Sequence, residues 1–144
     1  MDNIKIFSLQ EANRLLPELT RLLQSLQALR MEVLAKQVEI DALELVTDPE
    51  PSAMTMPPLL QDKLLEYDGM LERFRTGLEE IQDTGAVLKE LESGLIDFYS
   101  VIDSQIGYLC WKMGEPEIRF WHEIGKGFSH RQTLPVNQQD PNNS

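Results

Sequence analysis

The segment Leu60–Ile81, LQDKLLEYDGMLERFRTGLEEI, carries the clearest helical pattern in the chain. Its large apolar residues recur at alternating spacings of four and three, which places them in one stripe along one side of a helix. This stripe consists of Leu60, Leu64, Tyr67, Leu71, Phe74, Leu78 and Ile81. Each large side chain gains roughly 1.5–3 kcal/mol on full burial, so the helix needs a partner surface. We expect that partner to be the first half of the chain.

The first half predicts a longer helix over residues 9–46. Ser8 and Glu11 have the spacing of a capping box, in which each side chain bonds the backbone amide of the other residue. Pro17 removes one backbone hydrogen bond, so we expect a bend near residues 13–17 and not a break. The prolines after residue 48 end this helix, because they disfavour helix in the residues before them. The two helices then fold back antiparallel as a coiled-coil-like hairpin.

The flanking segments are shorter. Ile4–Phe7 predicts a short strand before the first helix. Gly85 lies where a helix commonly ends in a left-handed cap, which closes the second helix, expected over residues 58–84. Between residues 86 and 98, short apolar groups are separated by Glu-Ser-Gly, which predicts two short strands. A continued helix to Leu91 is the alternative.

The aromatic segment that follows predicts a β-hairpin. Its strands are Ile106–Lys112 and Glu117–His122, around the turn Met113–Pro116. Pairing Lys112 with Glu117 sorts the side chains into two faces. The apolar face, which we expect to lie on the helices, carries Leu109, Trp111, Ile118 and Phe120. The other face carries Tyr108, Cys110, Lys112, Glu117, Arg119 and Trp121. The predicted fold class is therefore α+β, a long helical hairpin with a small antiparallel sheet packed against it.

This pairing also bears on metal binding. Cys110 and His122 are typical metal ligands, but the predicted register projects them to opposite faces of the sheet. A site formed by Cys110, His122 and His130 is therefore not expected, and we predict no metal and no cofactor. Cys110 then serves as a small, partly buried side chain, and His122 as a hydrogen-bonded histidine at a strand end.

Composition limits the function classes. The chain has 144 residues and a net charge of −11, which disfavours binding to a phosphate backbone. It lacks an apolar run of the roughly 18 residues that a membrane span needs, so we expect no membrane insertion. Its single cysteine cannot form an internal disulfide, which is consistent with the cytoplasm. We expect one domain over residues 1–135 and a disordered, polar tail over residues 136–144.

Several segments together resemble the bacterial "domain of unknown function 2203" family over residues 4–134. They are FSLQEANRLLP at residues 7–17, GLIDF at 94–98, LCWKMGEPEI at 109–118, Trp121-His122, Gly127-Phe128 and Arg131-Gln132. The resemblance implies a small cytoplasmic protein with a long helical pair and a compact C-terminal segment, and no established activity. Asp97, Glu115, Trp121, His122 and Arg131 match the family pattern. Ser129 and His130 stand where the family has small residues, which makes His130 a poor candidate ligand.

Two functional hypotheses follow. The first is a non-enzymatic module that forms a homodimer through its helices and docks a protein partner on the face around Tyr108 and Trp121, because exposed aromatic residues are enriched in interfaces. The second is a small enzyme or ligand-binding protein with a pocket around His122. Arg131 then either clamps an anion or pairs with a carboxylate such as Asp97. The candidate residues are Asp97, Tyr108, Glu115, Trp121, His122 and Arg131.

Overall fold

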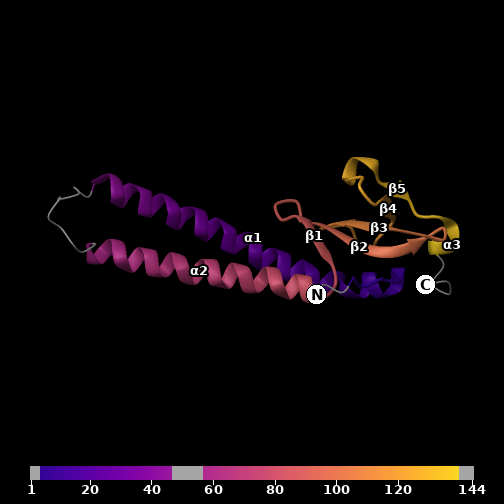
Figure 1. The fold of residues 1–144 in the computed structure, drawn as a ribbon, viewed down its shortest axis with the longest axis horizontal. Helices are drawn as coiled ribbons and strands as arrows, with labels where there is room; N and C mark the ends of the chain where they lie inside the picture. The colour runs from indigo at the N-terminus through magenta and orange to yellow at the C-terminus, as the bar shows by residue number, and fades with distance from the viewer. Residues whose placement is uncertain (1–3, 47–56, 140–144) are drawn as a thin grey trace. The chain divides into compact units, whose positions relative to one another are not determined.

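The computed structural model describes residues 4–46 and 57–139 of the chain. Figure 1 shows two long helices and a small sheet, which confirms the α+β class. The elements are α1 (Leu9–Val46), α2 (Pro58–Asp83), β1 (Val87–Glu90), β2 (Leu95–Ile102), β3 (Gln105–Lys112), β4 (Phe120–Glu123), η1 (Phe128–His130), β5 (Gln132–Thr133) and α3 (Val136–Gln139). The predicted tail thus begins with the short helix α3, and residues 140–144 lie outside the described part.

The chain divides into two compact units. One comprises residues 1–24 and 79–144, and the other comprises residues 25–78. The first unit contains the whole sheet together with the beginning of α1 and the end of α2. The second is a helical hairpin made of the remaining parts of α1 and α2. The single domain expected over residues 1–135 stays a prediction, because compactness alone does not show which parts fold independently.

Helix α1 begins as its sequence predicts. The backbone amide of Ser8 donates to Glu11 Oε1 at 2.9 Å, and the amide of Glu11 donates to Ser8 Oγ at 3.1 Å. This reciprocal pair is the predicted capping box. The helix continues through Pro17 without a break, also as predicted.

Charged residues and apolar residues both hold the helical hairpin of residues 25–78. Lys36 is nearly buried on the inner side of α1, and its Nζ atom lies 2.5 Å from Glu66 Oε2 on α2. Leu26 and Ile40 are buried on the same side of α1. The α2 stripe is covered less completely, since Leu71 is 41 % exposed and Leu78 is 37 % exposed. The hairpin therefore leaves part of its apolar surface in water.

The sheet is antiparallel and has the strand order β1-β2-β3-β4-β5. Strands β1 and β2 confirm the two short strands and exclude the helical alternative for residues 87–90. Gly85 has φ +94°, the left-handed conformation expected at the end of α2. Strand β2 is longer than predicted, because Asp103 and Ser104, with φ values of 51° and 68°, form a tight turn into β3.

The N-terminal segment lies along the edge of β2 but is not a strand, so that prediction was wrong. The Phe7 amide donates to the Tyr99 carbonyl at 2.7 Å, and Ser100 Oγ donates to the Phe7 carbonyl at 2.6 Å. The other residues of this segment form no ladder, since the capping box at Ser8 already turns the chain into α1. The segment anchors the start of the chain to the sheet.

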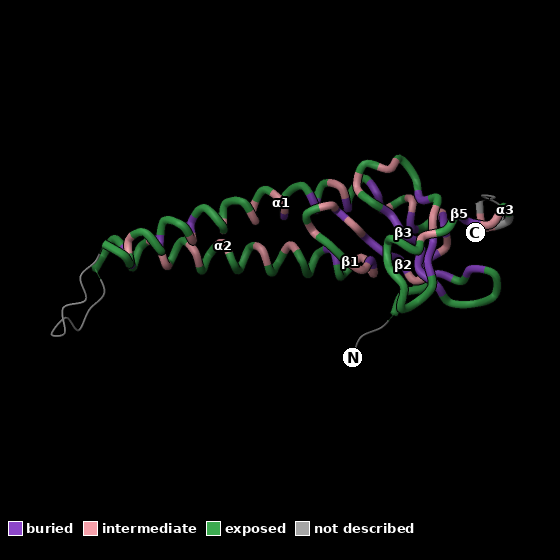
Figure 2. Tube along the Cα trace, turned by 90° about the horizontal axis from the view of Figure 1, so that it is seen from above, coloured by how far each residue is buried: buried purple, intermediate pink, exposed green. Residues whose placement is uncertain are grey.

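One face of the sheet forms the core of the first unit with the helices, as predicted, but Phe120, which was expected on that face, lies opposite Cys110 and faces the other side. Figure 2 shows buried residues concentrated along β2 and β3. The buried residues on this face are Ile96, Phe98, Ser100, Ile102, Leu109, Trp111 and Trp121. The ring of Phe98 contacts that of Phe7, and Leu19, Leu23 and Ile81 are buried in the same unit. Trp111 is 1 % exposed, so its expected burial is confirmed.

The predicted register of the hairpin between β3 and β4 was wrong by one residue. Leu109 lies opposite Trp121, where the prediction placed Phe120, and Tyr108 lies opposite His122. Strand β4 begins at Phe120 and not at Glu117, because the Ile118 amide donates to Asn13 Oδ1 on α1 at 2.9 Å. This bond draws the residues before β4 out of the ladder. Trp121 therefore faces the core, and His122 faces the opposite side.

Candidate functional site

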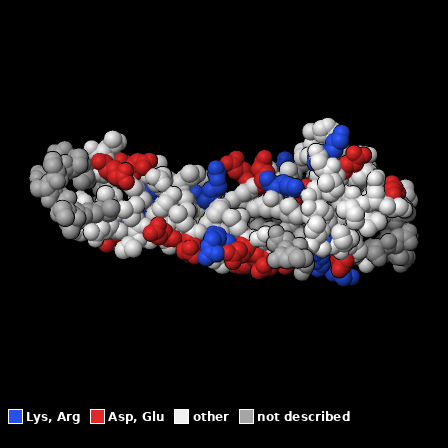
Figure 3. Space-filling model, viewed as in Figure 1, with Lys and Arg blue, Asp and Glu red and all other residues white. Residues whose placement is uncertain are grey.

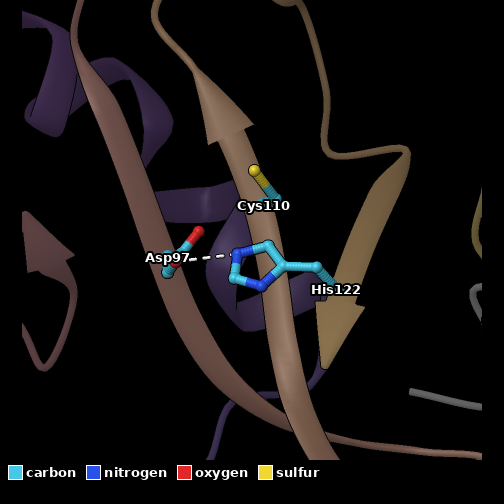
Figure 4. Close-up of side chains that lie close together, drawn as sticks. All are labelled: Asp97, Cys110 and His122. Carbon is cyan, nitrogen blue, oxygen red and sulfur yellow. Dashed lines mark hydrogen bonds and ion pairs between the residues drawn. The ribbon is translucent and has the colours of Figure 1, made fainter. Parts of the chain in front are cut away.

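The face of the sheet away from the core carries a buried polar cluster. Asp97 comes from β2, Cys110 from β3 and His122 from β4, with exposures of 2 %, 0 % and 2 %. Asp97 lies directly opposite Cys110, and His122 lies opposite Tyr108, two residues along the same strand. Side chains two residues apart share a face, so all these side chains project together. Figure 4 shows His122 reaching over β3 toward Asp97, with Cys110 beside them.

His122 is fixed at both ring nitrogens. Its Nε2 atom lies 2.9 Å from Asp97 Oδ2, and its Nδ1 atom lies 3.0 Å from the Glu123 carbonyl oxygen. A carbonyl oxygen only accepts, so Nδ1 must carry a proton. The shared proton of the remaining contact then lies either on Nε2 of an imidazolium or on a neutral Asp97 carboxyl. In both cases His122 Nε2 and Asp97 Oδ2 face each other across the same space.

The burial of the Asp97 carboxyl costs free energy of folding. Its Oδ1 atom is buried and has no hydrogen-bond partner among the described residues. Burial raises the pKa of the Asp97 carboxyl, while the charge of His122 and its hydrogen bond oppose that rise. Leaving a buried acceptor unpaired costs about 1–3 kcal/mol. Perturbed groups of this kind concentrate at functional sites.

Cys110 completes the cluster. One donor atom from each of Asp97, Cys110 and His122 lies within 4.8 Å of the other two. Burial, followed by the charge of Asp97, raises the pKa of the Cys110 thiol to about 12. The prediction that Cys110 and His122 project to opposite faces was therefore wrong, since it followed from the incorrect register. His130, the third ligand considered, is exposed on η1 and does not belong to this group.

Two tyrosines and a lysine border the cluster. Tyr108 Oη donates to Tyr99 Oη at 3.0 Å, and the ring of Tyr108 lies 5.2 Å from that of His122 between centroids. Burial and the contact with Tyr99 raise the pKa of Tyr108 to about 12. Lys89 Nζ lies 4.6 Å from the centroid of the Tyr108 ring. Its positive charge also acts on Asp97, where it favours the ionised carboxylate.

Arg131 pairs with Glu115 and not with Asp97, which corrects the suggested partner. Its Nη2 atom lies 2.6 Å from Glu115 Oε2, and its guanidinium stacks over the rings of Phe120 and Phe128 at 3.9 and 4.5 Å. Arg131 Nε is buried without a hydrogen-bond partner among the described residues. The guanidinium lies near enough to Cys110 to favour its thiolate. Figure 3 shows Lys and Arg side chains scattered among acidic ones on the visible face, without one continuous basic patch.

The structure brings together most of the predicted site residues. Asp97, Tyr108 and His122 form one cluster, and Glu115 pairs with Arg131 beside it. Trp121 lies on the core face, so it does not share the surface expected for it with Tyr108. The participation of Cys110 was not predicted from the sequence. The observed register between β3 and β4 would have predicted it, because in that register the side chains of Cys110 and His122 lie on the same face of the sheet as Asp97.

The fold and the cluster define a small α+β protein with a buried Asp-Cys-His group on one face of its sheet. Residues 5–134 match the family model described as "Uncharacterized conserved protein (DUF2203)". The chain belongs to this family, as its sequence motifs indicated. No curated protein and no solved structure matched the chain. Within the described residues, no helix combines the length and the apolar character that crossing a membrane requires.

Proposed function

We propose that the protein is a non-enzymatic, cytoplasmic assembly module that forms a homodimer through the outer side of α1. The observation that carries this proposal is a second apolar stripe on the hairpin of residues 25–78. We call it the outer stripe, and it consists of Met31, Leu34, Ala35, Val38, Ala42 and Leu45. Every one of these residues is exposed, and Val38 and Leu45 reach 68 % and 87 %.

Apart from Ala42, which lines a cavity with Leu59 and Lys63 of α2, the outer stripe is separate from the surface that holds the hairpin together. At 3.6 residues per turn, it lies roughly on the opposite side of α1 from Leu26, Lys36 and Ile40, which face α2. Residues 31, 35, 38, 42 and 45 follow the alternating spacing of four and three that is typical of coiled-coil seams. The stripe is about 21 Å long at 1.5 Å per residue. A second copy offers the same stripe, as a symmetric dimer requires.

The energetics favour covering this surface. Full burial of each large aliphatic or methionine side chain is worth roughly 1.5–3 kcal/mol, and the two alanines allow helices to approach closely. Partner recognition by the face around Tyr108 is not part of this proposal, because Tyr108 and Trp121 are each only 7 % exposed and offer no exposed aromatic surface. Placement in the cytoplasm is supported by the single, buried cysteine, which has no disulfide partner.

Light scattering on the full chain tests the dimer directly. We expect a dimer at micromolar concentration, and a monomer for Val38→Glu because the substitution puts a charge into the seam. Leu65→Glu is the matched control, since Leu65 on α2 is 70 % exposed and lies outside the outer stripe. A monomeric wild-type protein contradicts the proposal, and so does a Val38→Glu variant that remains as dimeric as Leu65→Glu.

A second candidate function is binding of a small anionic ligand at the polar face, around His122, Asp97, Glu115 and Arg131. It is favoured by the buried Nε atom of Arg131, which has no hydrogen-bond partner among the described residues. Inorganic phosphate tests it: the unfolding temperature of the wild-type chain should rise with phosphate, and that of Arg131→Ala should not. An equal response of the two proteins excludes this candidate.

A further inference from the structure

We propose that Asp97, Cys110 and His122 bind one divalent transition-metal ion of the Zn²⁺ class. The inference is independent of dimer formation and concerns only the polar face of the sheet. Its starting point is the mixed set of oxygen, sulfur and nitrogen donors within 4.8 Å of one another. Three strands supply one donor each, so the ladder that fixes the strands also fixes the donors.

The donor spacing fits coordination after small side-chain adjustments. Ideal zinc bonds of about 2.3 Å to sulfur and about 2.0–2.2 Å to nitrogen and oxygen place tetrahedral donors roughly 3.4–3.6 Å apart. The Nε2 atom of His122 lies 2.9 Å from Asp97 Oδ2, so this pair must open slightly. The sulfur of Cys110 must approach, and its separation from the other two donors never exceeds 4.8 Å. Rotations about side-chain bonds are sufficient for both changes.

The orientation of His122 matches that of a metal ligand. Metal-binding histidines commonly donate their second ring N–H to a carbonyl or carboxylate, which fixes the tautomer and the ring plane. His122 Nδ1 makes this contact with the Glu123 carbonyl oxygen at 3.0 Å. Its Nε2 atom is then the one available to a metal, and it points at the other two donors.

Asp97 provides the independent observation. Its buried Oδ1 atom lacks a hydrogen-bond partner among the described residues, and the whole side chain is only 3 % exposed. An Asp-His pair with a purely structural role leaves this oxygen unsatisfied at a cost of about 1–3 kcal/mol. A cation among the three donors removes that cost, because the carboxylate can turn either oxygen toward it.

The donor types select the metal. A thiolate favours zinc and similar borderline or soft ions over magnesium and calcium, which prefer oxygen donors alone. The thiolate of Cys110 and the carboxylate of Asp97 balance a charge of +2, with His122 neutral. Metal entry displaces the thiol proton and the proton shared by the Asp97–His122 pair, and both go to solvent. Zinc is usually four-coordinate, so the three protein ligands supply three of its four positions.

Cobalt binding to the full-length, untagged protein tests the proposal. Co²⁺ is added to the metal-free chain, and a thiolate-to-cobalt charge-transfer band is followed in the ultraviolet. We expect the band to saturate at one equivalent and to disappear when excess Zn²⁺ displaces the cobalt. This measurement uses the unchanged chain, so it does not depend on whether any variant folds.

Variants then assign the ligands. We expect Cys110→Ser to abolish the charge-transfer band. We expect His122→Gln to weaken Zn²⁺ binding by at least about 100-fold, because mutating a residue that only supports a ligand already weakens binding by up to about that factor. The matched control is His130→Gln, which alters the other histidine of the chain on exposed η1 and should bind as the wild type does. The proposal is overturned if the wild-type chain gives no band, or if the band persists in Cys110→Ser.

Discussion

His122 and Asp97 bond to each other across an intervening strand. The Nε2 and Oδ2 atoms are 2.9 Å apart, although β3 separates the strand of His122 from that of Asp97. Both side chains are nearly excluded from water, with side-chain exposures of 2 % and 3 %. The contact therefore ties β2 to β4 directly and makes each partner dependent on the other.

Removing His122 should destabilise the metal-free protein strongly. In His122→Ala, Asp97 stays buried without its partner, and breaking a buried pair in this way costs about 3–5 kcal/mol. Urea denaturation with a chelator present, followed by tryptophan fluorescence, measures the effect because both tryptophans lie in the same compact unit as His122. His130→Ala on exposed η1 should stay within about 0.5 kcal/mol of the wild type. Equal stability of the two variants contradicts the prediction.

The thiol of Cys110 should be protected in the folded, metal-free protein. Its side chain is 0 % exposed, so a disulfide reagent reaches it only when the sheet opens. We expect slow reaction in buffer and immediate reaction in denaturant, measured by release of the coloured thiol product. A Ser129→Cys substitution in a Cys110→Ala background places the only thiol at an exposed site and should react at once. Comparable rates for the two thiols in buffer would show that Cys110 is accessible.

Gly94 should tolerate alanine less well than Gly125 does. Both residues have positive φ, 70° and 87°, so both substitutions carry similar backbone strain. A Cβ atom at Gly94 lies 2.5 Å from Met113 Cβ, whereas a Cβ atom at Gly125 meets nothing within 4 Å. We expect Gly94→Ala to lose at least about 1 kcal/mol more than Gly125→Ala, in line with the cost of overpacking. Overlapping urea denaturation curves for the two variants would refute this.

The stability of the hairpin should depend on pH through Lys36 and Glu66. Their hydrogen bond lowers the pKa of Glu66 from its ordinary 4.5 and raises that of Lys36 from 10.5. The Glu66 contribution is present above pH 4.5 and is lost as the pH falls through the folded-state pKa. The Lys36 contribution is present below pH 10.5 and is lost as the pH rises through its folded-state pKa.

A Lys36→Met variant tests this dependence through the thermal midpoint followed by circular dichroism. The difference from the wild type should be constant between pH 4.5 and 10.5 and should change outside that window. Lys126→Met, which alters an exposed loop lysine, should follow the wild-type curve at every pH. If the difference in thermal midpoint between the wild type and Lys36→Met stays constant both below pH 4.5 and above pH 10.5, the prediction for Lys36 is wrong.

The helices were predictable because local signals define them. The capping box of Ser8 and Glu11 marks the start of α1, and Gly85 marks the end of α2, and both signals act within a few residues. The length of β2 was not predictable in the same way. The turn at Asp103 and Ser104 lacks the Asn-Gly or Asp-Gly pair that usually identifies a two-residue hairpin.

The site was harder to predict because its geometry depends on strand parity. A shift of one residue moves every side chain of a strand to the other face, so the error in the β3–β4 pairing moved His122 away from Cys110. The cause is a contact between distant residues, the bond from the Ile118 amide to Asn13. The partner of Arg131 is likewise set by tertiary packing, since Glu115 lies 16 residues away in sequence.

The anchor of Phe7 and Ser100 also constrains how the chain matures on the ribosome. The two residues are 93 positions apart, so the first turns of α1 emerge long before the strand that covers them. At a synthesis rate of about 5–20 residues per second, this delay lasts roughly 5–20 s. During that interval the apolar side of the nascent helix lacks its native partner. We therefore expect chaperones that shield exposed apolar segments to bind the nascent chain.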